Sequence, residues 1–241
     1  MIRALFVLLL VGLALVFVLP WFILWSLITG DPAAMYNMAM KTVRLILKLA
    51  GIRVRVEGLE NIPPAACVFA ANHISALDPL AFIPAIPRRV AILVKKELFR
   101  IPFLGAAMRL ANFVSVDRAD KEAAAASVDR AVERLKQGTS FAVYPEGTRS
   151  PDGHLRPFKK GAFVLAIQAA APVVPVSIVG AHALMPKGAR VIRSGDVVIR
   201  FGSPVDASQY TMEQRGELLA RVQSLVAADL PPEQQPLQPS T

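Results

Sequence analysis

The sequence predicts an α/β domain with a largely parallel mixed sheet flanked by helices, preceded by hydrophobic and amphipathic N-terminal helices. Three observations support this fold class. An uncharged apolar run opens the chain, a stretch with basic residues at helical spacing follows, and short apolar runs then alternate with helical patterns. We therefore divide the 241 residues into a membrane-anchoring segment (1–50), a globular domain (51–229) and a disordered tail (230–241).

The apolar run has no charged residue from Ala4 to Gly30. As one helix it would be about 40 Å long, at roughly 1.5 Å per residue, which is enough to cross a hydrocarbon core of about 30 Å. Pro20 interrupts the run, so it either spans the bilayer or dips into one leaflet and returns. It is too long for the apolar core of a cleaved signal peptide, which favours a retained anchor.

The next segment, residues 33–50, carries Lys41, Arg44 and Lys48 on one helical face. Such a basic stripe suits a helix lying in the membrane interface, and it equally suits an amphipathic helix packed on its own domain. These charges, with two arginines just beyond them, outweigh the single Arg3 before the apolar run. The positive-inside rule then places the globular part on the cytoplasmic side.

From residue 52 onward, short apolar runs alternate with helical stretches. Strict alternation over 52–56 predicts a half-buried strand, and apolar spacing predicts helices over 123–137 and 160–171. Thr211-x-x-Gln214 forms a capping box for a last helix, and residues 194–196 are predicted to turn a hairpin between 191–193 and 197–201. The other strand candidates are residues 67–71, 90–94, 113–116, 141–144 and 173–179. Because Pro175 lies inside the last of these, we expect it at a sheet edge or strand start.

The composition is both apolar and basic. Hydrophobic residues make up 54% and charged residues 19%, and 27 Lys+Arg against 18 Asp+Glu leave a net charge of +9. These values exclude a disordered chain and indicate an anionic lipid surface or a phosphorylated substrate. Nucleic acid is the alternative polyanion, but no recognition helix or aromatic stacking platform is present, so we expect no nucleic-acid partner. The single cysteine, Cys67, excludes an internal disulfide framework.

His73 follows a predicted strand, and Asp78 lies five positions later. In a compact strand-to-helix turn, the carboxylate could accept the Nδ1 hydrogen of the imidazole and leave Nε2 free as a base. His154 and His182 have lysines at the same offset, so neither has this partner. The spacing alone is a weak signal, because a surface histidine near a helix-capping aspartate would look the same.

A second polar segment, residues 144–150, also follows a predicted strand. Gly147 would let the backbone approach a ligand, and Thr148, Arg149 and Ser150 with nearby backbone amides could cradle a phosphate. An ordinary solvated loop explains the turn residues here, but it explains the clustered basic residues less well.

The motifs become specific when they are taken in order. They are Asn72-His73-x-x-x-x-Asp78, Lys95 to Pro102-x-x-Gly105 with Asp117-Arg118, Pro145-Glu146-Gly147-Thr148-Arg149-Ser150, and Val174-Pro175-Val176. This set resembles the glycerolipid acyltransferases, most closely the bacterial 1-acyl-sn-glycerol-3-phosphate acyltransferases. The resemblance covers residues 52–201, and a basic, membrane-associated helical pair is also typical of that family. Tyr144 stands where Phe is usual, a departure that we expect to leave the chemistry unchanged.

The resemblance implies a role for each of these residues. His73 would be the general base and Asp78 its orienting partner. The implied substrate-binding residues are Glu146, Gly147, Thr148, Arg149 and Ser150, with Lys95, Lys96 and Arg118 adding charge for a phosphate and Val174 and Pro175 on the acyl side. The family uses no metal and no covalent acyl-enzyme, and no Gly-x-Ser-x-Gly elbow occurs in this chain.

The expected activity is acyl transfer from acyl-CoA or acyl carrier protein to the sn-2 hydroxyl of 1-acylglycerol-3-phosphate, with no cofactor. The expected partners are a phospholipid bilayer, a lysophospholipid acceptor and the acyl donor, at the cytoplasmic face of a bacterial inner membrane. A different acceptor, such as a lyso-ornithine lipid, glycerol-3-phosphate or another lysolipid, would suit the same residues. An inactive membrane-tethered binding protein would require a damaged His-Asp pair or phosphate loop, and neither is seen.

Overall fold

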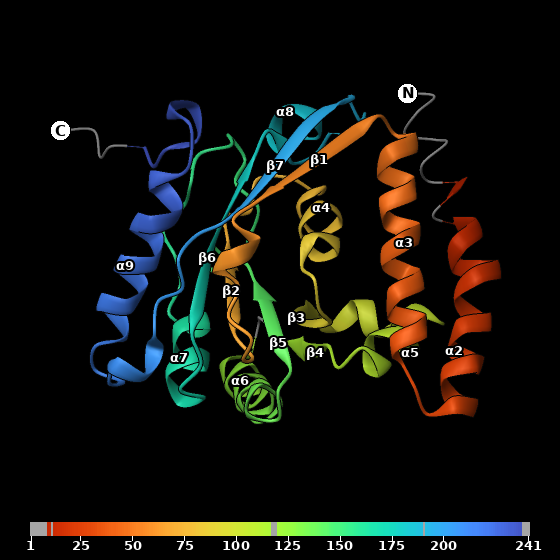
Figure 1. Ribbon diagram of the computed structural model, residues 1–241, viewed down its shortest axis with the longest axis horizontal. Coiled ribbons are helices and arrows are strands. Elements are labelled where there is room, and N and C mark those ends of the chain that lie inside the picture. The colour runs from red at the N-terminus through yellow and green to blue at the C-terminus, as the bar shows by residue number, and fades with distance from the viewer. Residues whose placement is uncertain (1–8, 11, 117–119, 190, 238–241) are drawn as a thin grey trace.

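The computed structural model describes residues 9–10, 12–116, 120–189 and 191–237, and it confirms a mixed, mostly parallel sheet flanked by helices (Figure 1). The strand order of this seven-stranded sheet is β1-β7-β6-β2-β5-β3-β4, and only the β6–β7 pair is antiparallel. The strands are β1 (Ile52–Glu57), β2 (Val68–Ala71), β3 (Val90–Lys95), β4 (Val114–Val116), β5 (Ser140–Val143), β6 (Val173–Val179) and β7 (Gly195–Phe201).

Helices cover both faces of the sheet, so the molecule has three layers. The core on one face includes side chains from α3, α4 and α8, and the core on the other face includes side chains from α6, α7 and α9. The helices are α2 (Leu19–Thr29), α3 (Ala33–Leu49), α4 (Asp78–Ala85), α5 (Leu104–Leu110), α6 (Lys121–Lys136), α7 (Gly161–Gln168), α8 (Ala181–Leu184) and α9 (Arg215–Ala228). Short helical turns are η1 (Ala14–Val18), η2 (Leu59–Asn61), η3 (Lys96–Arg100), η4 (Ala207–Gln209) and η5 (Pro232–Gln234).

Strand β6 corrects the expected position of Pro175. The proline is the third residue of a strand that lies between β2 and β7, in the interior of the sheet. Val176 pairs with Phe201 at the end of β7, and Val173 pairs with Val205 just beyond it. The two β6 members of these pairs are three positions apart, whereas Phe201 and Val205 are four positions apart, so the segment after β7 contains a bulge of one extra residue. The Pro175 carbonyl still accepts a hydrogen bond from Gly202 N at 2.9 Å. A bulge is one of the places where a strand tolerates a missing N–H.

The predicted hairpin at residues 194–196 is absent. Residues 191–194 form no strand, and β7 is occupied on both edges, by β1 in parallel and by β6 in antiparallel. A strand at 191–193 would therefore have no free edge of β7 to pair with. Local turn residues predicted the chain reversal, but they could not reveal that distant strands take both edges.

The N-terminal helices follow the predicted breaks. Pro20 lies in the first turn of α2, after the π-helical turn η1, and α2 ends at Gly30 with a φ of +68°. Helix α2 packs beside α3 and buries only Ile23 and Ser26 (Figure 1). No helix among the described residues combines the length and apolar character needed to cross a bilayer. The first eight residues of the predicted anchor lie outside the described residues.

The C-terminal part differs from expectation in two ways. Helix α9 begins at Arg215, one residue after the predicted capping box ends. One hydrogen bond of that box is present, because Gln214 Oε1 accepts from Thr211 N at 3.1 Å, but it lies before the first residue of the helix. Part of the predicted disordered tail packs on the domain: Leu230 and Gln234 are buried, and the Gln234 carbonyl accepts a hydrogen bond from Leu155 N at 2.9 Å, whereas Leu237 is exposed. Residues 238–241 lie outside the described residues.

Candidate active site

The candidate site lies at the carboxyl end of the central strands. His73 follows β2, and Tyr144 to Glu146 follow β5, the parallel neighbour of β2. The carboxyl ends of adjacent parallel strands meet at one edge of the sheet, which is where ligands bind in open α/β folds. The topology therefore brings the two predicted segments, 73 residues apart in sequence, into contact.

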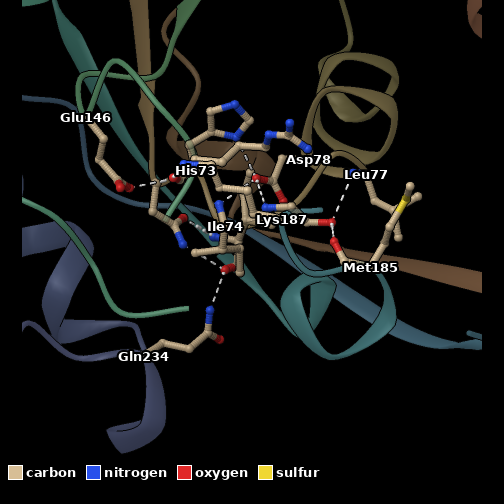
Figure 2. Close-up of polar contacts among 12 residues, drawn as sticks. His73, Ile74, Leu77, Asp78, Glu146, Met185, Lys187 and Gln234 are labelled. Carbon is tan, nitrogen blue, oxygen red and sulfur yellow. Dashed lines mark hydrogen bonds and ion pairs between the residues drawn. The ribbon is translucent and has the colours of Figure 1, made fainter. Parts of the chain in front are cut away.

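The predicted pairing of His73 with Asp78 is present (Figure 2). His73 Nδ1 lies 2.8 Å from Asp78 Oδ2, and the same oxygen accepts hydrogen bonds from Ile74 N at 2.7 Å and Ser75 N at 2.8 Å. Because Oδ2 acts as an acceptor for both amides, we assign the hydrogen of the third bond to Nδ1. Nε2 of His73 is then the unprotonated nitrogen, as a general base requires.

Burial separates the two members of this pair. Asp78 is fully buried, whereas the side chain of His73 keeps 18% of its surface exposed. Burial raises the pKa of Asp78, and the hydrogen bonds from His73 and the two amides act against that rise. The histidine can thus meet a substrate while the carboxylate stays shielded from water.

The turn that carries His73 is fixed on both sides by buried polar residues. Asn72 donates through Nδ2 to Ile178 O at 3.0 Å and accepts from Ile178 N at 2.7 Å, which ties the end of β2 to β6. Ser75 Oγ donates to Met185 O at 2.7 Å and accepts from Leu77 N at 3.0 Å (Figure 2). Asn72 and Ser75 were not among the predicted site residues, although both lie inside the motif.

Glu146 faces the backbone of His73. Its Oε1 accepts a hydrogen bond from His73 N at 2.7 Å, and Ser150 N donates to His73 O at 2.7 Å (Figure 2). Glu146 is 2% exposed, its Oε2 has no hydrogen-bond partner among the described residues, and burial raises its pKa to about 8. The loop therefore holds both backbone groups of His73, and Glu146 acts as a positioning residue.

Tyr144 stacks on the imidazole of His73. The two ring centroids are 4.1 Å apart and the planes differ by 21°. The Tyr144 hydroxyl is buried and has no partner among the described residues, and burial raises its pKa well above 10. We expected the Tyr-for-Phe departure at position 144 to leave the chemistry unchanged, and the stacking contact uses the ring that both residues share. The sequence signal for this contact is the place of Tyr144 directly after a strand.

The rest of the 144–150 loop gathers basic groups. Gly147 has a φ of +74°, and a Cβ there would lie 3.0 Å from Lys159 Nζ. Lys187 Nζ lies 3.4 Å from the carbonyl of Arg149, whose side chain is half-buried. The buried Ser150 hydroxyl donates to Asp152 Oδ1 at 2.7 Å, which leaves Thr148 as the exposed hydroxyl of the loop.

The remaining predicted residues lie farther from His73. Lys95 ends β3 and Lys96 begins η3, two strands from β2, and both are exposed. Arg118 lies outside the described residues. Val174 and Pro175 are buried in β6, and Val174 belongs to the core beneath α3 and α4, so their contact with an acyl chain stays a prediction.

Two further groups bear on the chemistry. Cys67 is buried, and burial raises its pKa to about 11, so its thiol is a poor nucleophile. The described residues contain no group of three or more His, Cys, Asp or Glu side chains arranged to hold a metal ion.

Comparison with known proteins agrees with this geometry. The family model described as Acyltransferase matches residues 53–179. The 1-acyl-sn-glycerol-3-phosphate acyltransferase of Limnanthes alba is 31% identical over 80% of this chain and 69% of its own length. The alpha form from Homo sapiens is 35% identical over 76% of this chain and 67% of its own. The crystal structure of the 1-acyl-sn-glycerophosphate (LPA) acyltransferase PlsC from Thermotoga maritima superposes with a TM-score of 0.83 at 31% identity, covering 93% of this chain and 92% of that one.

Proposed function

The chain belongs to the acyltransferase family, and from that membership we propose that it acylates the sn-2 hydroxyl of 1-acylglycerol-3-phosphate to give phosphatidic acid. The relatives and the solved structure support this acceptor through their names. The observation that carries the chemistry is the 2.8 Å contact between His73 Nδ1 and the buried Asp78. We further propose that the donor is acyl-CoA or acyl carrier protein.

In the transfer step, His73 Nε2 takes the proton of the acceptor hydroxyl while the hydroxyl oxygen attacks the thioester carbonyl carbon. Asp78 keeps the ring oriented and stabilises the imidazolium that forms. Collapse of the tetrahedral intermediate breaks the carbon–sulfur bond, and the thiolate leaves and takes the proton from His73. The step is balanced without a metal ion or other cofactor, so we expect full activity in the presence of EDTA.

For the acceptor phosphate we propose the basic groups of the 144–150 loop. Arg149 lies in this loop and Lys159 and Lys187 lie against it, the loop bonds to the backbone of His73, and Thr148 presents an exposed hydroxyl. Lys95, Lys96 and Arg118 stay predicted contributors of positive charge. A phosphate bound to this loop would determine which hydroxyl of the acceptor meets Nε2 of His73.

For localisation we propose the cytoplasmic face of the membrane, with residues 1–50 as the anchoring segment. Two features of the described residues support a membrane contact. Helix α2 exposes most of its large apolar side chains, and α3 exposes Lys41, Arg44 and Lys48 along one face. Both substrates are amphiphiles, so a site at the membrane surface raises their local concentration.

The test of the proposed function is transfer of a labelled acyl group from acyl-CoA to 1-acylglycerol-3-phosphate by the purified protein. We expect His73→Ala to abolish transfer while its circular dichroism and vesicle binding stay unchanged. His154→Ala is the matched control, because the ring of His154 bonds to the backbone of Gln235 and not to an aspartate, and this variant should retain transfer. Transfer retained in His73→Ala would contradict the assignment.

The acceptor is tested separately with one labelled donor and a panel of acceptors: 1-acylglycerol-3-phosphate, glycerol-3-phosphate, lyso-ornithine lipid and lysophosphatidylcholine. We expect the highest kcat/KM for 1-acylglycerol-3-phosphate. A higher kcat/KM for another acceptor would keep the chemistry and change the substrate.

A further inference from the structure

A hollow lies at the edge of the sheet, away from His73, and Lys96 is the one residue of its lining to which the proposed reaction has given a role. This pocket has a volume of about 290 Å³ and lies between η3, α5, β4 and α6. Its lining includes two aromatic and four basic side chains: Phe99, Phe113, Lys96, Arg109, Arg130 and Arg134. We call it the arginine pocket.

Hydrogen bonds to neighbouring protein groups hold the three arginines in place. Arg130 Nη2 donates to Ser127 Oγ at 2.7 Å, and Arg134 Nη1 donates to Asn112 Oδ1 at 2.7 Å. Arg109 lies over the ring of Phe99, 5.9 Å from its centroid. Among the residues that the structure describes, no carboxylate forms an ion pair with any of the three arginines.

This arrangement favours an anion. A guanidinium has five N–H donors, so each arginine keeps donors for a ligand after its bond to the protein. Three like charges around one small pocket repel each other, and an anion bound between them would offset that repulsion. Guanidinium groups match the geometry of phosphate oxygens, and aromatic rings beside them provide a surface on which a nucleobase can stack.

The position of the pocket decides which phosphate it suits. The registers across β2, β5, β3 and β4 place the start of β4 level with the end of β2. Three strand spacings separate the two strands, which is about 14 Å at about 4.8 Å per spacing. The acceptor phosphate sits on the carbon next to the one that bears the attacked hydroxyl, so it must stay close to His73. The phosphates of a coenzyme A thioester are joined to its sulfur by the long pantetheine arm, so they can lie at that distance.

We propose that the arginine pocket binds the phosphate groups of a coenzyme A thioester, with the base beside Phe99 and Phe113. The proposal rests on the proposed function, because it assigns the donor of that reaction. The volume is near the lower limit of ligand pockets, so we assign only the phosphorylated end of the donor to it. The arm would then run along the carboxyl ends of β3 and β5 towards His73.

The test compares two donors with the double variant Arg130→Gln/Arg134→Gln. One donor is palmitoyl-CoA, and the other is S-palmitoyl-pantetheine, which has the same thioester and no phosphate. We expect the variant to raise the KM for palmitoyl-CoA at least tenfold, to leave the KM for 1-acylglycerol-3-phosphate unchanged, and to use palmitoyl-pantetheine as the wild type does. Unchanged use of palmitoyl-pantetheine also shows that the variant is folded. The charge-matched control is Lys136→Gln/Arg221→Gln, which removes two exposed cations outside the pocket and should leave all three values unchanged.

Three outcomes would overturn the proposal. They are an unchanged KM for palmitoyl-CoA, a raised KM for 1-acylglycerol-3-phosphate alone, and, with palmitoyl-acyl carrier protein as a third donor, a raised KM for that donor alone. The last outcome would mean that the pocket binds an acidic protein surface. Titration of the wild type and the variant with adenosine 3′,5′-bisphosphate measures the pocket without catalysis, and we expect binding to the wild type only. If the wild type transfers no acyl group to any acceptor, the proposed function fails, while this titration still confirms or overturns the phosphate site.

Discussion

At the residue scale, three side chains around His73 each do a different task. Asp78 orients the ring through Nδ1, Glu146 holds the backbone through His73 N, and Tyr144 covers one face of the ring. The substrate can approach His73 only at the part of its side chain that these contacts leave exposed. Positive charge forms on the imidazole during transfer, so a stacked aromatic ring stabilises the transition state more than the ground state.

We therefore expect the aromatic ring of Tyr144, and not its hydroxyl, to matter for rate. Tyr144→Leu should lower kcat about 2- to 30-fold with little change in KM, since a cation–π contact contributes about 0.5–2 kcal/mol. Tyr144→Phe keeps the ring and removes a buried hydroxyl that lacks a partner among the described residues, so it should keep kcat and have an equal or higher Tm. Steady-state kinetics in micelles measures both variants. A wild-type kcat in Tyr144→Leu would contradict this role.

Glu146 gives the protein a pH-dependent stability whose sign can be worked out. Its pKa is about 8 in the folded protein and about 4.5 when unfolded, so the folded state binds more protons between these values. The contribution of Glu146 to the free energy of unfolding is therefore fully present below about pH 4.5 and is lost as the pH rises through about 8. At about 1.4 kcal/mol per pKa unit, the loss amounts to a few kcal/mol.

The matching variant is Glu146→Gln, whose amide oxygen can still accept the hydrogen bond from His73 N. We expect the fall in the free energy of unfolding between pH 5 and pH 8 to be smaller in this variant than in the wild type. Asp78, whose pKa is also raised, contributes the remaining slope. Urea unfolding in detergent at several pH values measures the slopes, with the exposed Glu122→Gln as control. Equal slopes in wild type and Glu146→Gln would rule out this titration.

At the scale of elements, local patterns predicted most helices and strands but not how the strands pair. The alternation at β1, the apolar runs of β2, β3 and β5, and the spacing of α6 all predicted elements that the structure contains. The interior place of Pro175 depends on a bulge in a segment almost thirty residues later. The absent hairpin depends on β1 and β6 occupying both edges of β7. These errors share a cause, because sheet order is set by distant packing that a local window does not contain.

The candidate site divides in the same way. His73 and Asp78 are five residues apart, so the spacing could predict their contact. Glu146 was predicted to contact the substrate, but it bonds to the His73 backbone across 73 residues of sequence. The stacking of Tyr144 on His73 likewise requires β2 and β5 to be neighbours. Motif order identified these residues, and only the sheet topology identifies what each one touches.

The turn after β1 brings the backbone of Gly58 close to the backbone of β7, and this contact can be tested. Gly58 follows β1 with a φ of +74°, and a Cβ there would lie 2.1 Å from the carbonyl oxygen of Phe201 in β7. Gly138 has a φ of +93° with no atom within 4 Å of such a Cβ, so it is the matched control. We expect Gly58→Ala to cost about 1–3 kcal/mol more than Gly138→Ala, or several degrees of Tm in a thermal melt. Equal melting temperatures would show that β7 moves away without cost.

At the scale of the whole molecule, apolar surface is distributed unevenly. The two cores on either face of the sheet are closed by α3, α4 and α8 on one side and by α6, α7 and α9 on the other. Helix α2 lies outside both layers, beside α3, and the packed C-terminal segment lies at the opposite end of the molecule (Figure 1). An apolar patch that the domain does not cover marks an interaction site, and beside a basic helix face an anionic lipid surface is the partner that suits both.

Trp21 and Trp25 on α2 test this view, because they are 64% and 49% exposed. Full burial of a large apolar side chain contributes about 1.5–3 kcal/mol, so Trp21→Ser/Trp25→Ser should weaken binding to anionic phospholipid vesicles at least about tenfold. The control Leu237→Ser removes an equally exposed apolar residue, 65%, from the C-terminal segment that follows α9, and it should bind as the wild type does. Vesicle sedimentation measures binding, and transfer between short-chain, water-soluble substrates measures the site, which should be unaffected because His73 and Asp78 are held by β2 and α4. Equal vesicle binding by the tryptophan variant and the control would show that the exposed face of α2 meets something other than lipid.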